Sequence, residues 1–120
     1  MKPAVRVLLI LVSAIFINQA GDKVVVASHQ AVSSVEGQQA VRDRYCVSCH
    51  NDRLKSGGFS WTQLDLAHPE QNAELAEKVV RKVRAGMMPP AGAPRADMAT
   101  MKSFAAALET RIDQAAAAHP

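Results

Sequence analysis

The pattern of apolar and polar residues along the chain predicts helices and no convincing strand. Ser33 and Glu36 have the spacing of a capping box, so a first helix is predicted to begin there and to continue through Tyr45. A last helix is predicted to begin near Asp97, because apolar residues recur after it at helical spacing. The stripe of this last helix consists of Met98, Met101, Ala105, Leu108 and Ile112.

A second helix is predicted between these two, beginning near Pro69 or Asn72 and ending at Gly86 as its C′ residue. Its polar face carries two i,i+4 pairs in the favourable order, Glu74–Lys78 and Glu77–Arg81. Its apolar stripe consists of Leu75, Val79, Val80 and Val83. The proline-rich stretch 87–94 cannot continue the helix. The pattern therefore predicts an all-α domain over residues 33–115, with three main helices joined by long loops.

The first residues have the pattern of a secretory signal. Lys2 and Arg6 precede an uncharged apolar run over residues 7–17, which is too short to span a bilayer comfortably. Small residues follow at Ala20 and Ala27, and either marks a cleavage site. We therefore interpret residues 1–27 as signal peptide and flexible lead-in, and we expect a periplasmic or otherwise exported protein. The alternative is an uncleaved anchor, which would place the protein at a membrane.

The positive charge of the chain is no argument for nucleic-acid binding. The 120 residues contain 14 Lys and Arg against 11 Asp and Glu, a net charge of +3. Removal of Lys2 and Arg6 with the leader leaves 12 basic residues and a net charge of +1. Cleavage after Ala27 also removes Asp22 and Lys23, so this balance does not change. We therefore expect no nucleic-acid partner.

The two cysteines lie three positions apart with a histidine directly after the second, in the sequence Cys46-Val47-Ser48-Cys49-His50. This is the covalent haem attachment pattern. On a helical turn, residues three and four apart share a face, so both thiols and the imidazole can point in one direction. The thiols would form two thioethers to haem c, and His50 would bind the iron from the proximal side.

Other roles of this motif fit less well. A Cys46–Cys49 disulfide is possible in an exported protein. A thioredoxin-type redox pair needs a βαβ setting, which the pattern lacks. A structural zinc site needs four ligands, and beyond Cys46, Cys49 and His50 the chain offers only isolated histidines such as His68.

The sixth iron position is predicted to be filled by a methionine, the usual ligand opposite His in electron-transfer cytochromes. Met88 precedes Pro89, which pushes its backbone into an extended conformation. Met87 is the alternative, but next to Gly86 it is expected to fold back onto the second helix. Met98 and Met101 are expected in the core, because they lie on the apolar stripe of the last helix.

The chain resembles a small class I cytochrome c, and most of all the planctomycete-type cytochrome c domain. In that family a Cys-Val-Ser-Cys-His motif is followed by Asn-Asp-Arg-Leu-Lys and a Gly-Gly turn, which stand here at residues 46–55 and 57–58. The sequence KVVRKVRAGMMPPAGAPR at residues 78–95 fits the second signature. The likeness covers roughly residues 40–110. It implies a class I fold whose first and last helices cross, where Gly37 would allow close approach to Phe104 and Leu108.

Motif and resemblance together predict a monohaem one-electron carrier and no enzyme, with redox proteins as donor and acceptor. A basic rim around the motif, formed by Arg42, Arg44, Arg53 and Lys55, would suit an acidic partner. Two alternatives stay open. A displaceable sixth ligand would give a ligand-binding or peroxidatic haem protein, and an uncleaved leader would suit a cytochrome subunit of a membrane oxidoreductase.

The leader generates a direct prediction. Exported protein should begin between Gly21 and Ser28, because cleavage follows the small residues after the apolar run. N-terminal sequencing of the periplasmic or secreted fraction checks this. An intact Met1 on the exported form would show instead that the leader is retained as an anchor.

Overall fold

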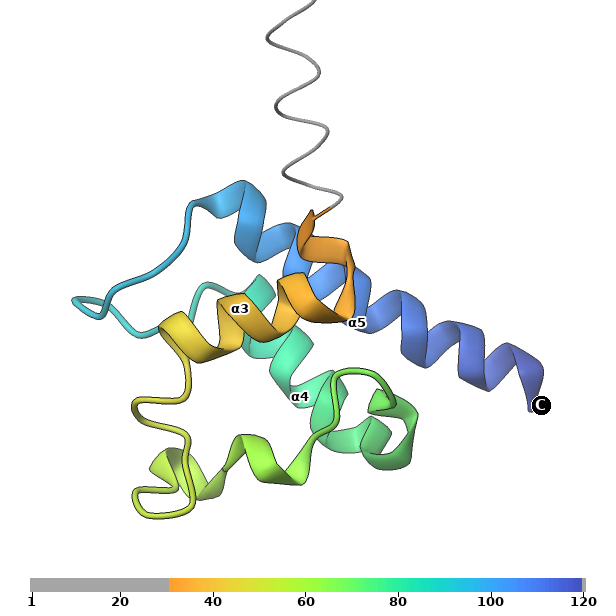
Figure 1. Ribbon diagram of the computed structural model, residues 1–120, viewed down its shortest axis with the longest axis horizontal. Helices are drawn as coiled ribbons and strands as arrows, with labels where there is room; N and C mark the ends of the chain where they lie inside the picture. The colour runs from red at the N-terminus through yellow and green to blue at the C-terminus, as the bar shows by residue number, and fades with distance from the viewer. Residues whose placement is uncertain (1–30, 120) are drawn as a thin grey trace, which may run out of the picture.

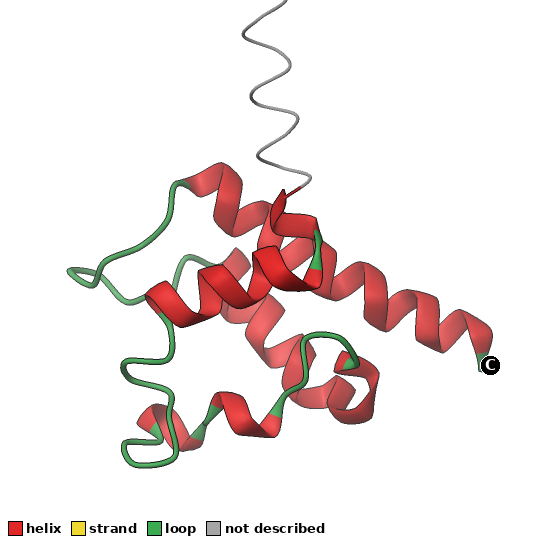
Figure 2. Cartoon of the chain, viewed as in Figure 1, coloured by secondary structure: helices red, strands yellow, loops and turns green. Residues whose placement is uncertain are grey.

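A computed structural model describes residues 31–119, and within this range the chain is helical without a strand (Figure 2). The α-helices are α3 (Val35–Tyr45), α4 (Ala73–Arg84) and α5 (Met98–Ala118). Three short 3-10 helices lie between α3 and α4, at Ser56–Gly58, Trp61–Gln63 and Pro69–Asn72. The all-α prediction is confirmed for this part of the chain. The predicted signal peptide, with Ala20 and Ala27, lies outside the described residues.

Helix α3 begins one residue later than the predicted capping box. The hydroxyl of Ser34, not Ser33, accepts a hydrogen bond from the Gly37 amide at 3.0 Å. Residues 31–33 are also helical and fold back over the first turn of α3. A Cβ at Gly37 would lie 1.6 Å from the Ala31 carbonyl oxygen. Gly37 therefore allows the close approach of this preceding segment, because a side chain there would collide with the Ala31 backbone.

Helix α4 has the predicted polar face and the predicted end. The pairs Glu74–Lys78 and Glu77–Arg81 form at 3.0 and 3.3 Å. Gly86 has a φ of 67°, its amide donates to the Val83 carbonyl at 3.0 Å, and the Met87 amide donates to the Lys82 carbonyl at 3.0 Å. This pair of hydrogen bonds is a Schellman motif, which satisfies carbonyls that the helix end leaves free.

Helix α5 begins at the predicted cap, because the Asp97 carboxylate accepts from the Thr100 amide at 2.9 Å. Hydrogen bonding to Thr100 also lowers the pKa of Asp97. The predicted stripe is buried except at its first position, since Met98 in the first turn is 73% exposed. Phe104, on the same face, is 1% exposed. The helix continues through the alanine run to Ala118, a stretch that the sequence predicted to fray.

The core lies where α4 and α5 pack against each other, with the 3-10 segments beneath them (Figure 1). Ala76 and Val80 of α4 meet the buried face of α5, and Trp61, Leu64 and Leu66 close the core from the loop side. No described helix has the length and apolar content needed to cross a bilayer.

Helix α3 lies across α5 (Figure 1), and one buried glutamine joins the two helices. Gln38 is fully buried, and its amide nitrogen donates to the Phe104 carbonyl at 3.1 Å. Its amide oxygen accepts from Arg111, whose guanidinium also donates to the Ser33 carbonyl at 2.9 Å. The contact between the first and last helices therefore depends on polar groups that are fully paired inside the protein.

We expect Gln38→Leu to lower the free energy of unfolding by about 1–3 kcal/mol, because it leaves the buried side of Arg111 without its acceptor. Guanidinium denaturation followed by far-UV circular dichroism measures this. Gln114→Leu is the matched control, because Gln114 is exposed on α5; its effect should stay within about 0.5 kcal/mol. Equal effects of the two substitutions would contradict a structural role for the Gln38 bridge.

Candidate functional site

A cavity of about 580 Å³ opens between the end of α3, the inner side of α4 and the loop that joins α4 to α5. This volume is typical of a small-molecule or cofactor site. Its lining is mostly apolar, and it includes Cys46, Cys49, His50 and Met88. The structure thus brings four of the sequence-predicted site residues to one cavity. Met87, the alternative to Met88, does not line it.

The end of α3 turns the motif toward this cavity. Cys46 is the C-cap of the helix, and its own carbonyl accepts from the amides of Cys49 and His50, at 3.2 and 3.0 Å. These two bonds close a tight turn directly after the helix. Both thiols and the imidazole therefore reach the same cavity from five consecutive residues.

The segment after the motif folds back and fixes the turn from outside. The Asn51 side chain donates to the Val47 carbonyl at 2.9 Å and accepts from the Leu54 amide at 3.0 Å. The Ser56 amide donates a hydrogen bond to the Cys49 carbonyl at 3.2 Å. Gly57 has a φ of 65°, which L side chains rarely adopt, and allows the reversal that was predicted here.

Aromatic rings connect the motif to the core. The ring of His50 lies 5.2 Å from Phe59, Phe59 lies 5.1 Å from Trp61, and Trp61 lies 6.3 Å from Phe104 on α5, measured between ring centres. The Trp61 amide also donates to the His50 carbonyl at 3.1 Å. The backbone and ring of His50 are thus both held by this aromatic row, which limits the rotation of the imidazole.

The two adjacent methionines are placed differently. Met88 and Pro89 line the cavity, and Pro89 is buried. Met87 is 53% exposed, and its sulfur lies 3.7 Å from the Lys82 ammonium. Met87 therefore folds back onto the second helix, as predicted, but it contacts Lys82 there and more than half of its side chain stays exposed.

Helix α4 presents two apolar faces where the sequence predicted one stripe. Ala76 and Val80 pack against α5, whereas Leu75, Val79 and Val83 are half-buried and line the cavity. At 100° per residue, these five side chains span an arc of about 140°. An apolar arc this wide exceeds what one neighbouring helix covers. The width of the arc could therefore have predicted, from the sequence, that α4 has a second apolar neighbour. Met101 was likewise assigned to the core alone, yet it also lines the cavity.

Two buried nitrogens at the cavity have no hydrogen-bond partner within the described residues, His50 Nδ1 and Trp61 Nε1. A buried donor without a partner is costly, so its position beside a cavity indicates an acceptor on whatever fills that cavity. Trp61 was not singled out by sequence analysis. Its indole N–H is the polar group that sequence analysis missed.

The charged groups that line the cavity are all basic, namely Arg44, Lys78 and Lys82. Lys78 is paired with Glu74, and Arg44 lies over the Tyr45 ring at 5.5 Å. Of the predicted basic rim, only Arg44 reaches the cavity wall. The lining therefore favours an apolar occupant that carries negative charge.

The donor set fits a covalently bound haem. Both cysteines are free thiols, and with His50 and Met88 they supply attachment groups and iron ligands of the expected chemistry. The apolar wall suits the ring, and the unpartnered Trp61 N–H and the lining cations suit its carboxylates.

The competing interpretations find less support in the described residues. Both cysteines are free there, and no group of three or more His, Cys, Asp or Glu side chains is arranged to hold a metal ion. His68 is exposed, with its Nδ1 atom 3.2 Å from Glu70, so it offers no ligand to the motif.

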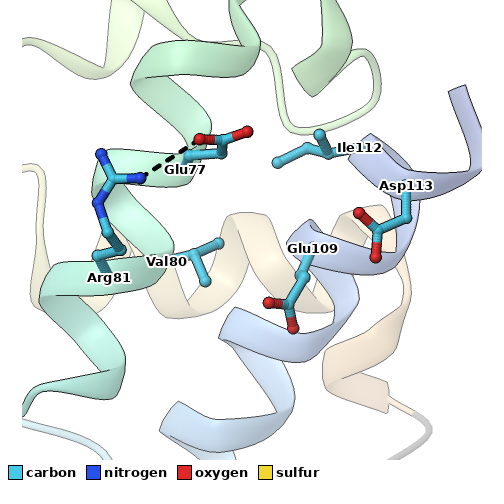
Figure 3. A pocket seen from close by; sticks show the side chains of 6 residues that line it. All are labelled: Glu77, Val80, Arg81, Glu109, Ile112 and Asp113. Carbon is cyan, nitrogen blue, oxygen red and sulfur yellow. Dashed lines mark hydrogen bonds and ion pairs between the residues drawn. The ribbon is translucent and has the colours of Figure 1, made fainter. Parts of the chain in front are cut away.

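A smaller cavity of about 230 Å³ lies between α4 and α5 (Figure 3). Glu77, Glu109 and Asp113 extend around it, and Arg81 is paired with Glu77 at 3.3 Å. None of the sequence-predicted site residues lies there.

Comparison with family models, with curated proteins and with solved structures finds no match for this chain.

Burial raises the pKa of the Cys46 thiol from its ordinary value of 9.0 to about 11, although Arg42 nearby acts in the opposite direction. Without the cofactor, we expect Cys46 in Cys49→Ser to react slowly with iodoacetamide at pH 8, because only the thiolate is nucleophilic. Its rate should rise about tenfold per pH unit and level off only near pH 11. Mass spectrometry of quenched samples measures the rate.

Cys46→Ser is the matched control, since it leaves the exposed Cys49 as the reacting thiol. A Cys46 rate that already levels off near pH 9 would show that this thiol is not buried in solution.

Proposed function

We propose that this chain is an exported monohaem c-type cytochrome of the class I fold that carries one electron between redox proteins. The observation that carries the proposal is that Cys46, Cys49, His50 and Met88 line one apolar cavity. The planctomycete-type resemblance and the predicted export signal support it. When bound, haem supplies a one-electron ferrous–ferric couple.

The residues of the chain have distinct roles in this proposal. Cys46 and Cys49 would attach the haem, and His50 and Met88 would supply ligands to its iron. Phe59 and the Trp61 amide hold His50 in place through the contacts described above. A ligating histidine usually donates its other ring N–H to an acceptor. His50 Nδ1 has no such acceptor within the described residues, so packing against Phe59 is what orients the imidazole.

The cavity wall controls the environment of the cofactor. Leu75, Val79 and Val83 on α4 exclude water from one side, while Phe104 and Met101 on α5 close the inner end. A low dielectric and a thioether ligand both favour the ferrous state and raise the reduction potential. Arg44, Lys78 and Lys82 would partly neutralise the cofactor's carboxylates, and Trp61 Nε1 would donate to one of them.

If His50 and Met88 both bound the iron, no ligand position would remain for a substrate, which favours electron transfer over catalysis. A peroxidatic or ligand-binding haem protein would require that Met88 be displaced easily. The placement of Met88 at the cavity, beside the buried Pro89, supports the electron carrier instead. Attachment to a membrane oxidoreductase stays a hypothesis about the leader.

The test of covalent attachment is an intact mass after expression with a haem-maturation system. Denatured protein should retain the mass of one haem, because two thioethers survive unfolding. Cys49→Ala should leave at most one bond, and His50→Ala should abolish a normal low-spin spectrum. Complete loss of haem on acid-acetone extraction would overturn the proposal.

Met88 and Met87 provide a matched pair for the sixth ligand. Met88→Ala should lose the near-red ferric charge-transfer band and lower the reduction potential markedly, because the thioether ligand is removed. Met87→Leu should keep both, since Met87 is directed to solvent. Absorption spectra and potentiometric titration measure the two properties.

The reverse pattern would identify Met87 as the ligand. Unchanged spectra and potentials in both variants would mean that neither methionine binds the iron.

A further inference from the structure

We propose that Arg95 is the positioning residue that holds the Met88 loop against the cavity, an inference that rests on the proposed function. The loop in question, residues 86–96, joins the end of α4 to the cap of α5. It is the long connection that leaves the body of the molecule beyond the end of α4 in Figure 1. The amides of Gly86, Met87 and Met88 donate to carbonyls of α4, but beyond Met88 the backbone of the loop does little to fix its shape.

Proline composition explains this weakness. Pro89, Pro90 and Pro94 have no amide N–H to donate. Within residues 89–96 of the described chain, one backbone hydrogen bond forms, from the Ala93 amide to the Pro90 carbonyl at 3.1 Å. This bond closes the tip of the loop only. It does not join the two arms near Met88.

Arg95 supplies the missing connection. Its Nη2 atom donates to the Pro89 carbonyl and, at 3.4 Å, to the Gly86 carbonyl. These two acceptors flank Met88 in the sequence, two residues before it and one after it. An –NH₂ group has two hydrogens, so one nitrogen can serve both carbonyls. The returning arm of the loop thus clamps the backbone on either side of the proposed ligand.

The clamp has a functional consequence for the iron. A weak external ligand such as imidazole can bind ferric haem only if Met88 first leaves, and Met88 leaves more easily when its loop is not clamped. Arg95 therefore adds to the affinity of Met88 for the iron without touching the iron itself. We expect the loss of these two hydrogen bonds at the surface to change this competition by roughly tenfold.

The experiment is a spectroscopic titration of the ferric holoprotein with imidazole. Arg95→Gln should bind imidazole about tenfold more tightly than wild type, because the shorter side chain no longer reaches both carbonyls. Arg95→Met removes every donor and keeps an unbranched side chain, so its effect should be at least as large as that of Arg95→Gln. Arg81→Gln is the control, because it removes the same charge from the outer side of α4, where Arg81 pairs with Glu77.

The outcomes separate the inference from the proposed function. Wild type that carries covalent haem and the near-red band, with Arg95→Gln no different from Arg81→Gln, overturns the role of Arg95 and leaves the cytochrome intact. Wild-type affinity in Arg95→Met would show that the donors of Arg95 are not needed, which also overturns the clamp. Wild type without covalent haem or without the band overturns both the function and the inference.

A measurement on wild type keeps the proposal testable where a variant does not fold. In the NMR spectrum of the ferrous holoprotein, hydrogen bonding should slow rotation of the Arg95 guanidinium. We expect resolved Nη protons with nuclear Overhauser effects to Pro89. An averaged, rapidly exchanging guanidinium signal would overturn the clamp.

Discussion

The constraint on which this structure depends is an apolar cavity between α3, α4 and the loop that joins α4 to α5. Leu75, Val79 and Val83 of α4 line it, while the neighbouring face of the same helix is packed against α5. Apolar surface left facing water forfeits about 25 cal/mol for each Å². A domain this small has little core to compensate, so an apolar body bound in the cavity would complete the hydrophobic packing.

The end of α3 determines what such a body can be attached to. The Cys46 carbonyl accepts hydrogen bonds from two amides, and the resulting turn brings both thiols and the imidazole to one cavity. Outside this turn, Asn51 and Ser56 tie the following loop to the same segment. The attachment groups are therefore held by local hydrogen bonds. The imidazole of His50 is held by packing against Phe59, and this row of aromatic rings continues to α5.

The other side of the cavity, formed by the loop between α4 and α5, is held by different interactions. Prolines restrict the backbone of residues 89–94 but remove its donors, so a guanidinium side chain takes over the hydrogen bonding. The Schellman turn at Gly86 separates the two methionines, directing one to solvent and leaving the next at the cavity. One side of the proposed site thus depends on a helix end, and the other depends on a loop that is clamped from outside.

The sequence by itself predicted the α-helices and two of their ends, because each of these depends on residues within one turn of one another. Asp97 as a cap and Gly86 as a C′ residue are examples of such local signals. Tertiary structure decided which faces pair. Ala31 lies closest to Gly37, and Gln38 makes the buried connection to Phe104 across 66 positions. The periodicity of apolar residues could not identify these neighbours. It also could not show which apolar residues of α4 face α5 and which face the cavity, because the hydrophobic effect is non-directional and does not specify the partner.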